Sequence, residues 1–307
     1  MNRSDFRERF EEFIAYLDVE KGVSAHTLKS YFLDLHQFQE FWKHIETTDN
    51  KTHSFKTTLD RFFVNLYHKQ ICKSSIARKI SCFNSFEKFL LTQNIELKLT
   101  LKRPKIDRKL PVFLSIDEVF HLLDTISNEQ LPTEHPERDR TILEFLYATG
   151  IRCSELTTIT VQDIDFDEKT IRIKGKGNKE RLVLFGEKAK SQALKYVSTE
   201  RIKPQTRNEN FFLNNRLEQM SCRAIQRIIK MFRQFLKIER NITPHKIRHT
   251  FATHMLNQGV DLRVVQELLG HKSLSSTEKY THVSTPHLIH IYDTIHPIKA
   301  MTKKAHK

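Results

Sequence analysis

Cysteine is scarce in this sequence, and the cysteines that are present follow no ligand or disulfide pattern. The 307 residues include four of them: Cys72, Cys82, Cys153 and Cys222. No two have the CxxC spacing or another spacing typical of metal ligands. The pattern argues against both a disulfide framework and a zinc site, and it predicts reduced thiols in a cytoplasmic protein.

Long apolar runs are also lacking. Residues 1–17 alternate charged and apolar side chains at helical spacing, without the apolar core of a secretory signal. No later run approaches the length that a membrane-spanning helix needs. We find no internal repeat and no low-complexity segment. The sequence therefore predicts a soluble, intracellular protein without a membrane anchor.

Acidic residues are outnumbered by basic ones. The chain has 51 Lys and Arg against 37 Asp and Glu, a formal net charge of +14, and the excess is spread along the sequence. Such a charge favours a polyanionic partner, with nucleic acid the leading candidate. A ribosome-associated protein or one that binds anionic membranes can carry the same charge. The length favours two domains, each large enough to bury a core.

Residues 1–97 are predicted to form an all-helical domain of four or five helices. Apolar residues recur at three- and four-residue steps over 28–45 and 76–90, and Ser24 is suited to cap the first of these helices. Lys73, Arg78 and Lys79 lie off the apolar stripe, where they would contact DNA phosphates or simply form a solvated helix face. The solvated face is the default for any single lysine.

Residues 98–112 are expected to form an extended linker between the domains. They combine six basic residues with Pro104 and Pro111. A linker that crosses a DNA backbone would use that charge, and a merely soluble tether would tolerate it.

Residues 113–307 are predicted to form a second, mostly helical domain with one small antiparallel sheet, so the whole chain is mainly α. Helices are expected to begin after Ser115 and near Arg138, and two short alternating runs, 170–173 and 181–185, flank a glycine-rich turn typical of a hairpin. A helix over 221–237 aligns three basic residues at i, i+4 and i+7, namely Arg223, Arg227 and Lys230. This stripe is a candidate phosphate contact, with a solvated face as the default.

The stretch 243–283 places reactive side chain types at fixed intervals. Thr243 and Pro244 predict a helix start, so His245 and Arg248 share one face of its first turn. Gly259 is predicted to end that helix.

A second helix is expected from its cap, Asp261, through Leu269. Gly270 then predicts a sharp left-handed stop that sets His271 on a fixed corner. Tyr280 follows in a polar segment, where a presented hydroxyl explains it better than a core position.

Together these motifs resemble the signature of the tyrosine recombinases, the phage integrase family, and most of all the bacterial Xer site-specific recombinases. The likeness rests on His-x-x-Arg, Leu-Leu-Gly-His and Tyr-Thr-His in this stretch, on Ala-Thr-Gly-Ile-Arg-Cys-Ser-Glu-Leu at 148–156, and on the lysine-bearing hairpin 174–181. It implies a SAM-like core-binding domain at 1–97, a catalytic domain at 113–307, and a carboxy-terminal helix that links subunits.

The resemblance also implies six catalytic roles. Tyr280 would be the nucleophile that forms a 3′-phosphotyrosyl intermediate, with Lys176 as general acid and His245 as general base. Arg152 and Arg248 would neutralise the charge on the phosphate oxygens, and His271 would hydrogen-bond the scissile phosphate. No metal or cofactor is expected. His245 and His249 at i, i+4 suggest a metal pair, but the cationic side chains around them argue against it.

Three alternative functions remain open: a type IB topoisomerase that relaxes supercoils, an integrase of a mobile element, and a DNA-binding protein that has lost catalysis. The helical first domain and the Leu-Leu-Gly-His motif favour a recombinase, and a chain that begins with the core-binding domain favours a Xer-like role in resolving chromosome or plasmid dimers through a Holliday junction. The implied partners are a double-stranded recombination site and a homo- or hetero-tetramer of recombinases on two such sites. Apolar residues at 288–295 fit the subunit-linking helix.

Overall fold

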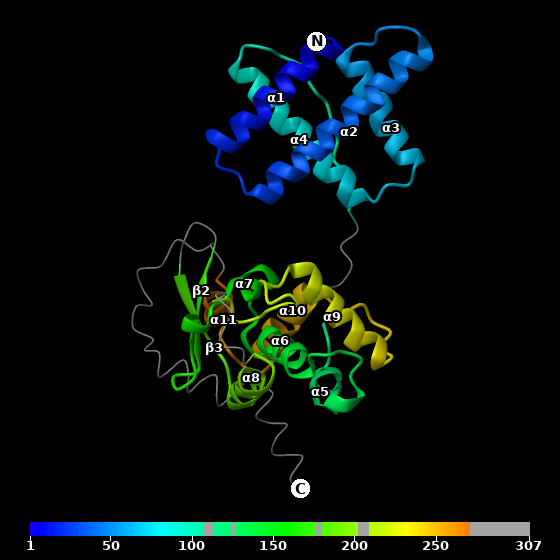
Figure 1. The fold of residues 1–307 in the computed structure, drawn as a ribbon. Coiled ribbons are helices and arrows are strands. Elements are labelled where there is room, and N and C mark those ends of the chain that lie inside the picture. Colours follow the sequence, from blue (N-terminus) through cyan, green and yellow to red (C-terminus); the bar gives the residue numbers. More distant parts are fainter. Residues whose placement is uncertain (107–112, 125–126, 176–179, 202–208, 271–307) are drawn as a thin grey trace. The chain divides into compact units, whose positions relative to one another are not determined.

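The chain divides into two compact units, Met1–Leu110 and Pro111–Lys307. The computed structural model describes residues 1–106, 113–124, 127–175, 180–201 and 209–270 (Figure 1). The first unit is helical throughout its described elements, and the second is mainly helical with a small antiparallel sheet. The predicted fold class is therefore confirmed. No helix in these ranges combines the length and apolar character needed to cross a bilayer.

In the described part of the first unit, residues 1–106, four helices pack around an aromatic core. They are α1 (Arg3–Val19), α2 (Ala25–Asp49), α3 (Phe55–His68) and α4 (Lys73–Thr92). Ser24 caps α2 as predicted, since its hydroxyl accepts a hydrogen bond from the backbone N–H of Thr27 at 3.2 Å. Phe38 and Phe86 are fully buried and meet Phe6 edge to face, so three helices contribute rings to one cluster.

The segment after α4 is partly packed against this helical unit. Leu99 and Leu101 lie against the first core, and the backbone N–H of Leu99 donates to Glu87 at 2.6 Å. The start of the expected linker, 98–112, is thus tied to the first unit, and 98–106 contain no helix or strand. Its role as a linker on DNA stays a prediction.

Helix α6 (Pro136–Thr149) is the centre of the second unit. Nearly all its side chains from Arg138 onward are buried. The α-helices that contact it within the described residues include α5 (Ile116–Asp124), α7 (Cys153–Thr158), α8 (Glu187–Thr199), α9 (Cys222–Phe235) and α10 (Pro244–Asn257). In Figure 1, α6 lies among these helices while the sheet lies at one side of the unit. The residues that follow its carboxyl end are held by this core.

The sheet has three antiparallel strands in sequential order, β1 (Ile164–Asp165), β2 (Thr170–Lys174) and β3 (Glu180–Leu184). The predicted hairpin is β2 and β3, with Ile173 opposite Arg181 and Lys174 opposite Glu180. Strand β1 and helices α7 and α8 have no counterpart in the sequence-based prediction. Helix α8 buries mainly Ala189, Ala193 and Tyr196, so it lacks the stripe of large apolar residues that marks the other helices.

Candidate active site

Helix α10 begins as its sequence predicts. The Thr243 hydroxyl accepts a hydrogen bond from the backbone N–H of Lys246 at 3.2 Å, and Pro244 occupies the first turn. His245 and Arg248 share a face of this helix, but His245 is exposed whereas Arg248 is buried. The helix therefore presents an imidazole to solvent and holds a guanidinium beneath it.

Arg248 joins two helix ends that are far apart in the chain. Its Nη1 donates to the carbonyl oxygen of Gly150 and its Nη2 to that of Leu269, each at 2.7 Å. Gly150 ends α6, and Leu269 is the last residue of α11 (Leu262–Leu269). Carbonyl groups at helix ends lack intrahelical partners, so a buried guanidinium between two such ends satisfies both.

This arrangement brings two of the predicted motifs together. Gly270 has the left-handed backbone predicted for it, with φ of 66°, and Gly150 at the end of α6 has the same conformation, with φ of 60°. Arg152 comes two residues after Gly150, and Gly270 comes directly after Leu269. Because Arg248 holds both corners, the motif at 148–156 lies beside the end of the Leu-Leu-Gly motif.

Glu155 is a buried carboxylate that binds two further arginines. Its Oε1 accepts a hydrogen bond from Arg152 Nη1 at 2.8 Å, and its Oε2 accepts one from the Arg152 backbone N–H at 2.8 Å. Arg181 donates to the same two oxygens through Nη1 and Nη2, at 2.9 Å and 2.8 Å. Burial opposes ionisation of this carboxyl, but the hydrogen bonds from Arg181 and Arg152 outweigh it and lower the pKa of Glu155.

Positive charge exceeds negative charge around these residues. The guanidinium groups of Arg152 and Arg181 bind the carboxylate of Glu155, and that of Arg248 is near enough to interact with it electrostatically. Burial, together with the nearby Arg152, lowers the pKa of Arg248 to about 10. The Arg152 side chain is 45% exposed, so an incoming anion can reach it. Arginines bind phosphate oxygens through forked hydrogen bonds, and a phosphate would relieve the repulsion among these cations.

Half of the predicted catalytic residues can be located in this way, and half cannot. The described part of the second unit includes Arg152, His245 and Arg248, and the charge of Arg152 is near enough to lower the pKa of Arg248. Lys176, His271 and Tyr280 fall in 176–179 and 271–307, outside the described residues.

Sequence reasoning assigned no role to Glu155 or Arg181, although both stand inside the motifs that carried the family resemblance. The usable signal was the spacing of Glu155, three residues after Arg152, which is the position of a carboxylate in a capping box. Arg181 has no comparable local signal, since a basic residue on a hairpin strand is ordinarily solvated.

Two of the predicted DNA contacts in the first unit are engaged by Asp34. Lys79 is buried, and its ammonium donates to Asp34 Oδ1 at 2.7 Å and to Gln37 Oε1 at 2.6 Å. Arg78 donates to Asp34 Oδ2 and to the Ser30 carbonyl, while its side chain stays 43% exposed. The charge of Lys79 is therefore used inside the fold, and the structure does not favour it as a phosphate contact. Arg78 and Lys73 remain accessible candidates.

The predicted basic stripe on α9 is present on the surface. Ser221 caps this helix, and Arg223, Arg227 and Lys230 are exposed on it. The opposite face buries the apolar residues Ile225, Ile228, Ile229 and Phe232. The stripe thus keeps its charges available to a polyanion.

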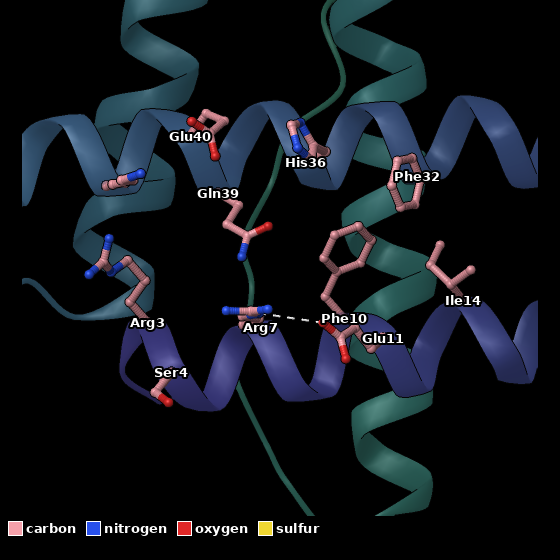
Figure 2. Close-up of a pocket in the computed structure, with 11 residues that line it drawn as sticks. Arg3, Ser4, Arg7, Phe10, Glu11, Ile14, Phe32, His36, Gln39 and Glu40 are labelled. Atoms are coloured by element: carbon pink, nitrogen blue, oxygen red, sulfur yellow. Dashed lines mark hydrogen bonds and ion pairs between the residues drawn. The ribbon is translucent and has the colours of Figure 1, made fainter.

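A hollow of about 750 Å³ lies between α1 and α2 in the first unit. Figure 2 shows that the rings of Phe10 from α1 and Phe32 from α2 lie close together in its lining, and that Arg7 is paired to Glu11 on α1. Its charged lining mixes both signs, since Glu40 also contributes. Such a lining gives no preference for a phosphate. We therefore place the candidate active site in the second unit, at Arg152, Arg181 and Arg248 near Glu155, which we call the arginine cluster.

Comparison with known proteins shows which family the chain belongs to. The family model described as "Phage integrase family" matches residues 113–287, and the one described as "Phage integrase, N-terminal SAM-like domain" matches residues 10–94. The chain is 38% identical to tyrosine recombinase XerC of Thermodesulfovibrio yellowstonii, covering 93% of this chain and 95% of that protein. It is 37% identical to tyrosine recombinase XerD of Staphylococcus epidermidis, covering 94% and 98%.

A solved structure shares the fold. The XerH site-specific recombinase bound to difH substrate, in a pre-cleavage complex, is similar with a TM-score of 0.68 and 23% identity, over 80% of this chain and 74% of that one. At this identity the likeness concerns the fold alone. The two domain matches and the relatives aligned over nearly their full length show that the chain belongs to the phage integrase family, as a Xer-type tyrosine recombinase that breaks and rejoins DNA.

Proposed function

We propose that this enzyme resolves dimers of circular chromosomes or plasmids by recombination between two copies of one DNA site. The proposal is supported by the similarity to XerC and XerD proteins over more than nine-tenths of the chain. The observation that carries its chemistry is the arginine cluster, in which Arg248 ties the Gly150 corner to the end of α11 with an excess of positive charge around Glu155.

The proposed reaction begins with attack of the Tyr280 hydroxyl on the scissile phosphorus. A bond forms between the phenolic oxygen and phosphorus, the bond from phosphorus to the 5′ oxygen breaks, and the DNA is held as a 3′-phosphotyrosyl ester. His245 accepts the tyrosine proton and Lys176 supplies a proton to the leaving 5′ oxygen. The 5′ hydroxyl of the other site then attacks the phosphotyrosine and gives its proton to Lys176. The bond from phosphorus to the tyrosine oxygen breaks, and His245 returns a proton to Tyr280. A phosphodiester is restored, and a Holliday junction results.

Arg152 and Arg248 stabilise the charge on the phosphate oxygens in this scheme, and His271 donates a further hydrogen bond to the phosphate. Preorganised cations are effective here because they are already oriented by the protein before the charge develops. The carbonyl groups of Gly150 and Leu269 fix Arg248, and Glu155 fixes Arg152, so neither guanidinium has to be ordered by the substrate.

A suicide DNA substrate tests the nucleophile. The wild-type chain is expected to form a covalent DNA adduct on a denaturing gel, with EDTA present throughout, whereas Tyr280→Phe binds the site but forms none. Tyr67→Phe, at an exposed position in α3, is the matched control and keeps the adduct. An adduct in Tyr280→Phe would exclude Tyr280 as the nucleophile.

A plasmid that carries two sites separates the candidate functions. A recombinase is expected to give deletion or resolution products, while a topoisomerase would only relax the supercoils. If the wild-type chain relaxes the plasmid and never exchanges strands, the proposed role in dimer resolution is wrong.

Assembly on DNA is part of the proposal. A lambda integrase of similar fold is known as a tetramer bound to a Holliday junction, at 16% identity and a TM-score of 0.66. We expect four copies of this chain, or two copies with two of a related recombinase, to act on two sites. Deletion of 288–307, which lies outside the described residues, should leave binding to a half site intact and abolish cooperative binding to the full site in a gel-shift titration. Unchanged cooperativity would mean that this segment packs on its own subunit.

A further inference from the structure

Arg181 lies where three parts of the candidate active site meet. It is on β3, opposite Ile173 in the stem of the hairpin whose turn carries Lys176. Its two Nη groups bind both oxygens of Glu155, at 2.9 Å and 2.8 Å, and the same carboxylate binds Arg152. The stem of the hairpin is therefore fastened to α7 through one carboxylate.

The third part is the corner at Gly270. A Cβ atom added there would lie 2.8 Å from both Cδ and Nε of Arg181, closer than real Cβ contacts allow. The left-handed backbone of Gly270 already favours glycine. Gly259 is also left-handed, with φ of 87°, yet an added Cβ there meets no atom of the described residues within 4 Å. Position 270 thus requires glycine for a second reason, because Arg181 packs against its backbone and leaves no room for a Cβ atom.

Fold stability alone gives a poor explanation for an arginine at this position. The Nε of Arg181 is buried and has no hydrogen-bond partner among the described residues. Leaving a buried donor unpaired costs free energy, and replacing a buried ion pair by apolar residues is often neutral or stabilising. Arg181 therefore occupies a position where it adds little to stability. It contacts Glu155, which binds Arg152, and Gly270, which precedes His271, and it lies on the hairpin that carries Lys176.

We propose that Arg181 is a positioning residue for DNA cleavage, which sets the hairpin stem, Arg152 and the corner before His271 in one fixed arrangement. Its guanidinium group donates two hydrogen bonds to Glu155, and its side chain packs against the backbone of Gly270. This inference rests on the proposed function, because it assumes that Arg152, Lys176 and His271 act on the scissile phosphate.

Single-turnover cleavage of a suicide substrate, at saturating full-length enzyme, measures positioning apart from binding. Arg181→Lys keeps the charge but cannot offer two parallel Nη donors to Glu155. We expect it to slow cleavage by about 100-fold, the cost typical of a misplaced catalytic group, with DNA affinity and melting temperature close to those of the wild type. The matched control is Arg172→Lys on the neighbouring strand, where Arg172 is 48% exposed and pairs with Asp163. The control should cleave at the wild-type rate.

Paired glycine variants test the second contact. Gly259→Ala and Gly270→Ala each place a side chain on a left-handed backbone, but only Gly270→Ala displaces Arg181. We expect cleavage to be slowed strongly in Gly270→Ala and little in Gly259→Ala. Adding Gly270→Ala to Arg181→Ala should then cost much less than it costs in the wild type, because the obstructing side chain has been removed.

Coupling to Arg152 completes the test. If Arg181 acts through Glu155, Arg181→Lys should slow cleavage far less in an Arg152→Ala background than in the wild type. Full cleavage by Arg181→Lys, equal effects of the two glycine variants, or additive effects with Arg152→Ala would each overturn the inference. Failure of the proposed function looks different, because the wild-type chain itself would then form no covalent adduct.

Discussion

In each unit of this chain, a buried carboxylate is bound by two cationic side chains: Asp34 in the first unit and Glu155 in the second. In the first unit, Asp34 binds Lys79 and Arg78, which come from one helix, and the side chains of the two cations are 7% and 43% exposed. Asp34 itself is only 1% exposed. The carboxylate thus holds one cation inside the fold and directs the other toward the surface.

The second unit repeats this arrangement with Glu155. Arg181 is its more buried cation, at 16% exposure, and Arg152 is the more exposed one, at 45%. The two cations come from different elements, and Arg248 adds a further positive charge that is held by the carbonyl groups of two helix ends. A carboxylate bound by two cations therefore joins two helices in one unit and lies within the candidate active site in the other. The difference between the two carboxylates lies in their surroundings, since Glu155 has a third cation, Arg248, nearby.

Neutralising Glu155 should have the largest effect. Glu155→Gln leaves Arg152, Arg181 and Arg248 without their common counter-charge, so we expect a loss of about 3–5 kcal/mol of unfolding free energy for the second unit. Cleavage under single-turnover conditions should also fall by more than about 100-fold. Denaturant unfolding and the suicide-substrate assay measure the two effects. Wild-type cleavage in this variant would mean that the cluster is only structural.

The equivalent change in the first unit should separate stability from chemistry. Asp34→Asn removes the counter-charge of the buried Lys79. We expect the unfolding free energy of the first unit to fall by a comparable amount, about 3–5 kcal/mol. Cleavage of saturating DNA at a temperature where the variant is folded should stay near the wild-type rate. A loss of cleavage as large as that of Glu155→Gln would remove the distinction between the two clusters.

The two cations bound to Asp34 should differ in their contribution to DNA affinity. Arg78→Ala is expected to reduce the slope of log affinity against log salt by about 1, as for the loss of one phosphate contact. Lys79→Met should leave that slope unchanged because Lys79 is buried. Filter-binding titrations over a series of salt concentrations measure both slopes. A reduced slope for Lys79→Met would return this residue to the list of DNA contacts.

A smaller effect is expected from comparing Glu155 with Glu144, a second buried carboxylate of the same unit. Burial raises the pKa of Glu144, only partly offset by Lys188, whereas the pKa of Glu155 is lowered. A raised folded-state pKa favours stability at low pH, and this contribution is lost as the pH rises through that value. Glu144→Gln should therefore gain stability relative to the wild type as the pH rises above the ordinary range of a glutamate.

Glu155→Gln should show the reverse trend. A lowered folded-state pKa stabilises the fold above the unfolded value and is lost as the pH falls through the folded one. The deficit of Glu155→Gln relative to the wild type should therefore shrink in acid. Thermal unfolding between acid and neutral pH measures both variants, and parallel curves for the two would contradict the opposite shifts.

The sequence by itself determined the local features of this protein. The caps at Ser24 and Thr243, the left-handed stop at Gly270 and the β2–β3 hairpin could all be predicted, because each depends on residues within a few positions of one another. Motif order was enough to reveal the family, since those motifs are themselves local patterns. Helix α8 escaped prediction because alanines provide much of its buried face.

Only the tertiary structure decided which charged residues are buried and what each of them holds. Lys79 meets Asp34 across 45 residues, Glu155 meets Arg181 across 26, and Arg248 meets Gly150 across 98. Burial makes an unpaired charge costly, so these pairs depend on packing between distant elements, which no local period records. For the same reason, the second requirement for glycine at position 270 became visible only when Arg181 was found against it.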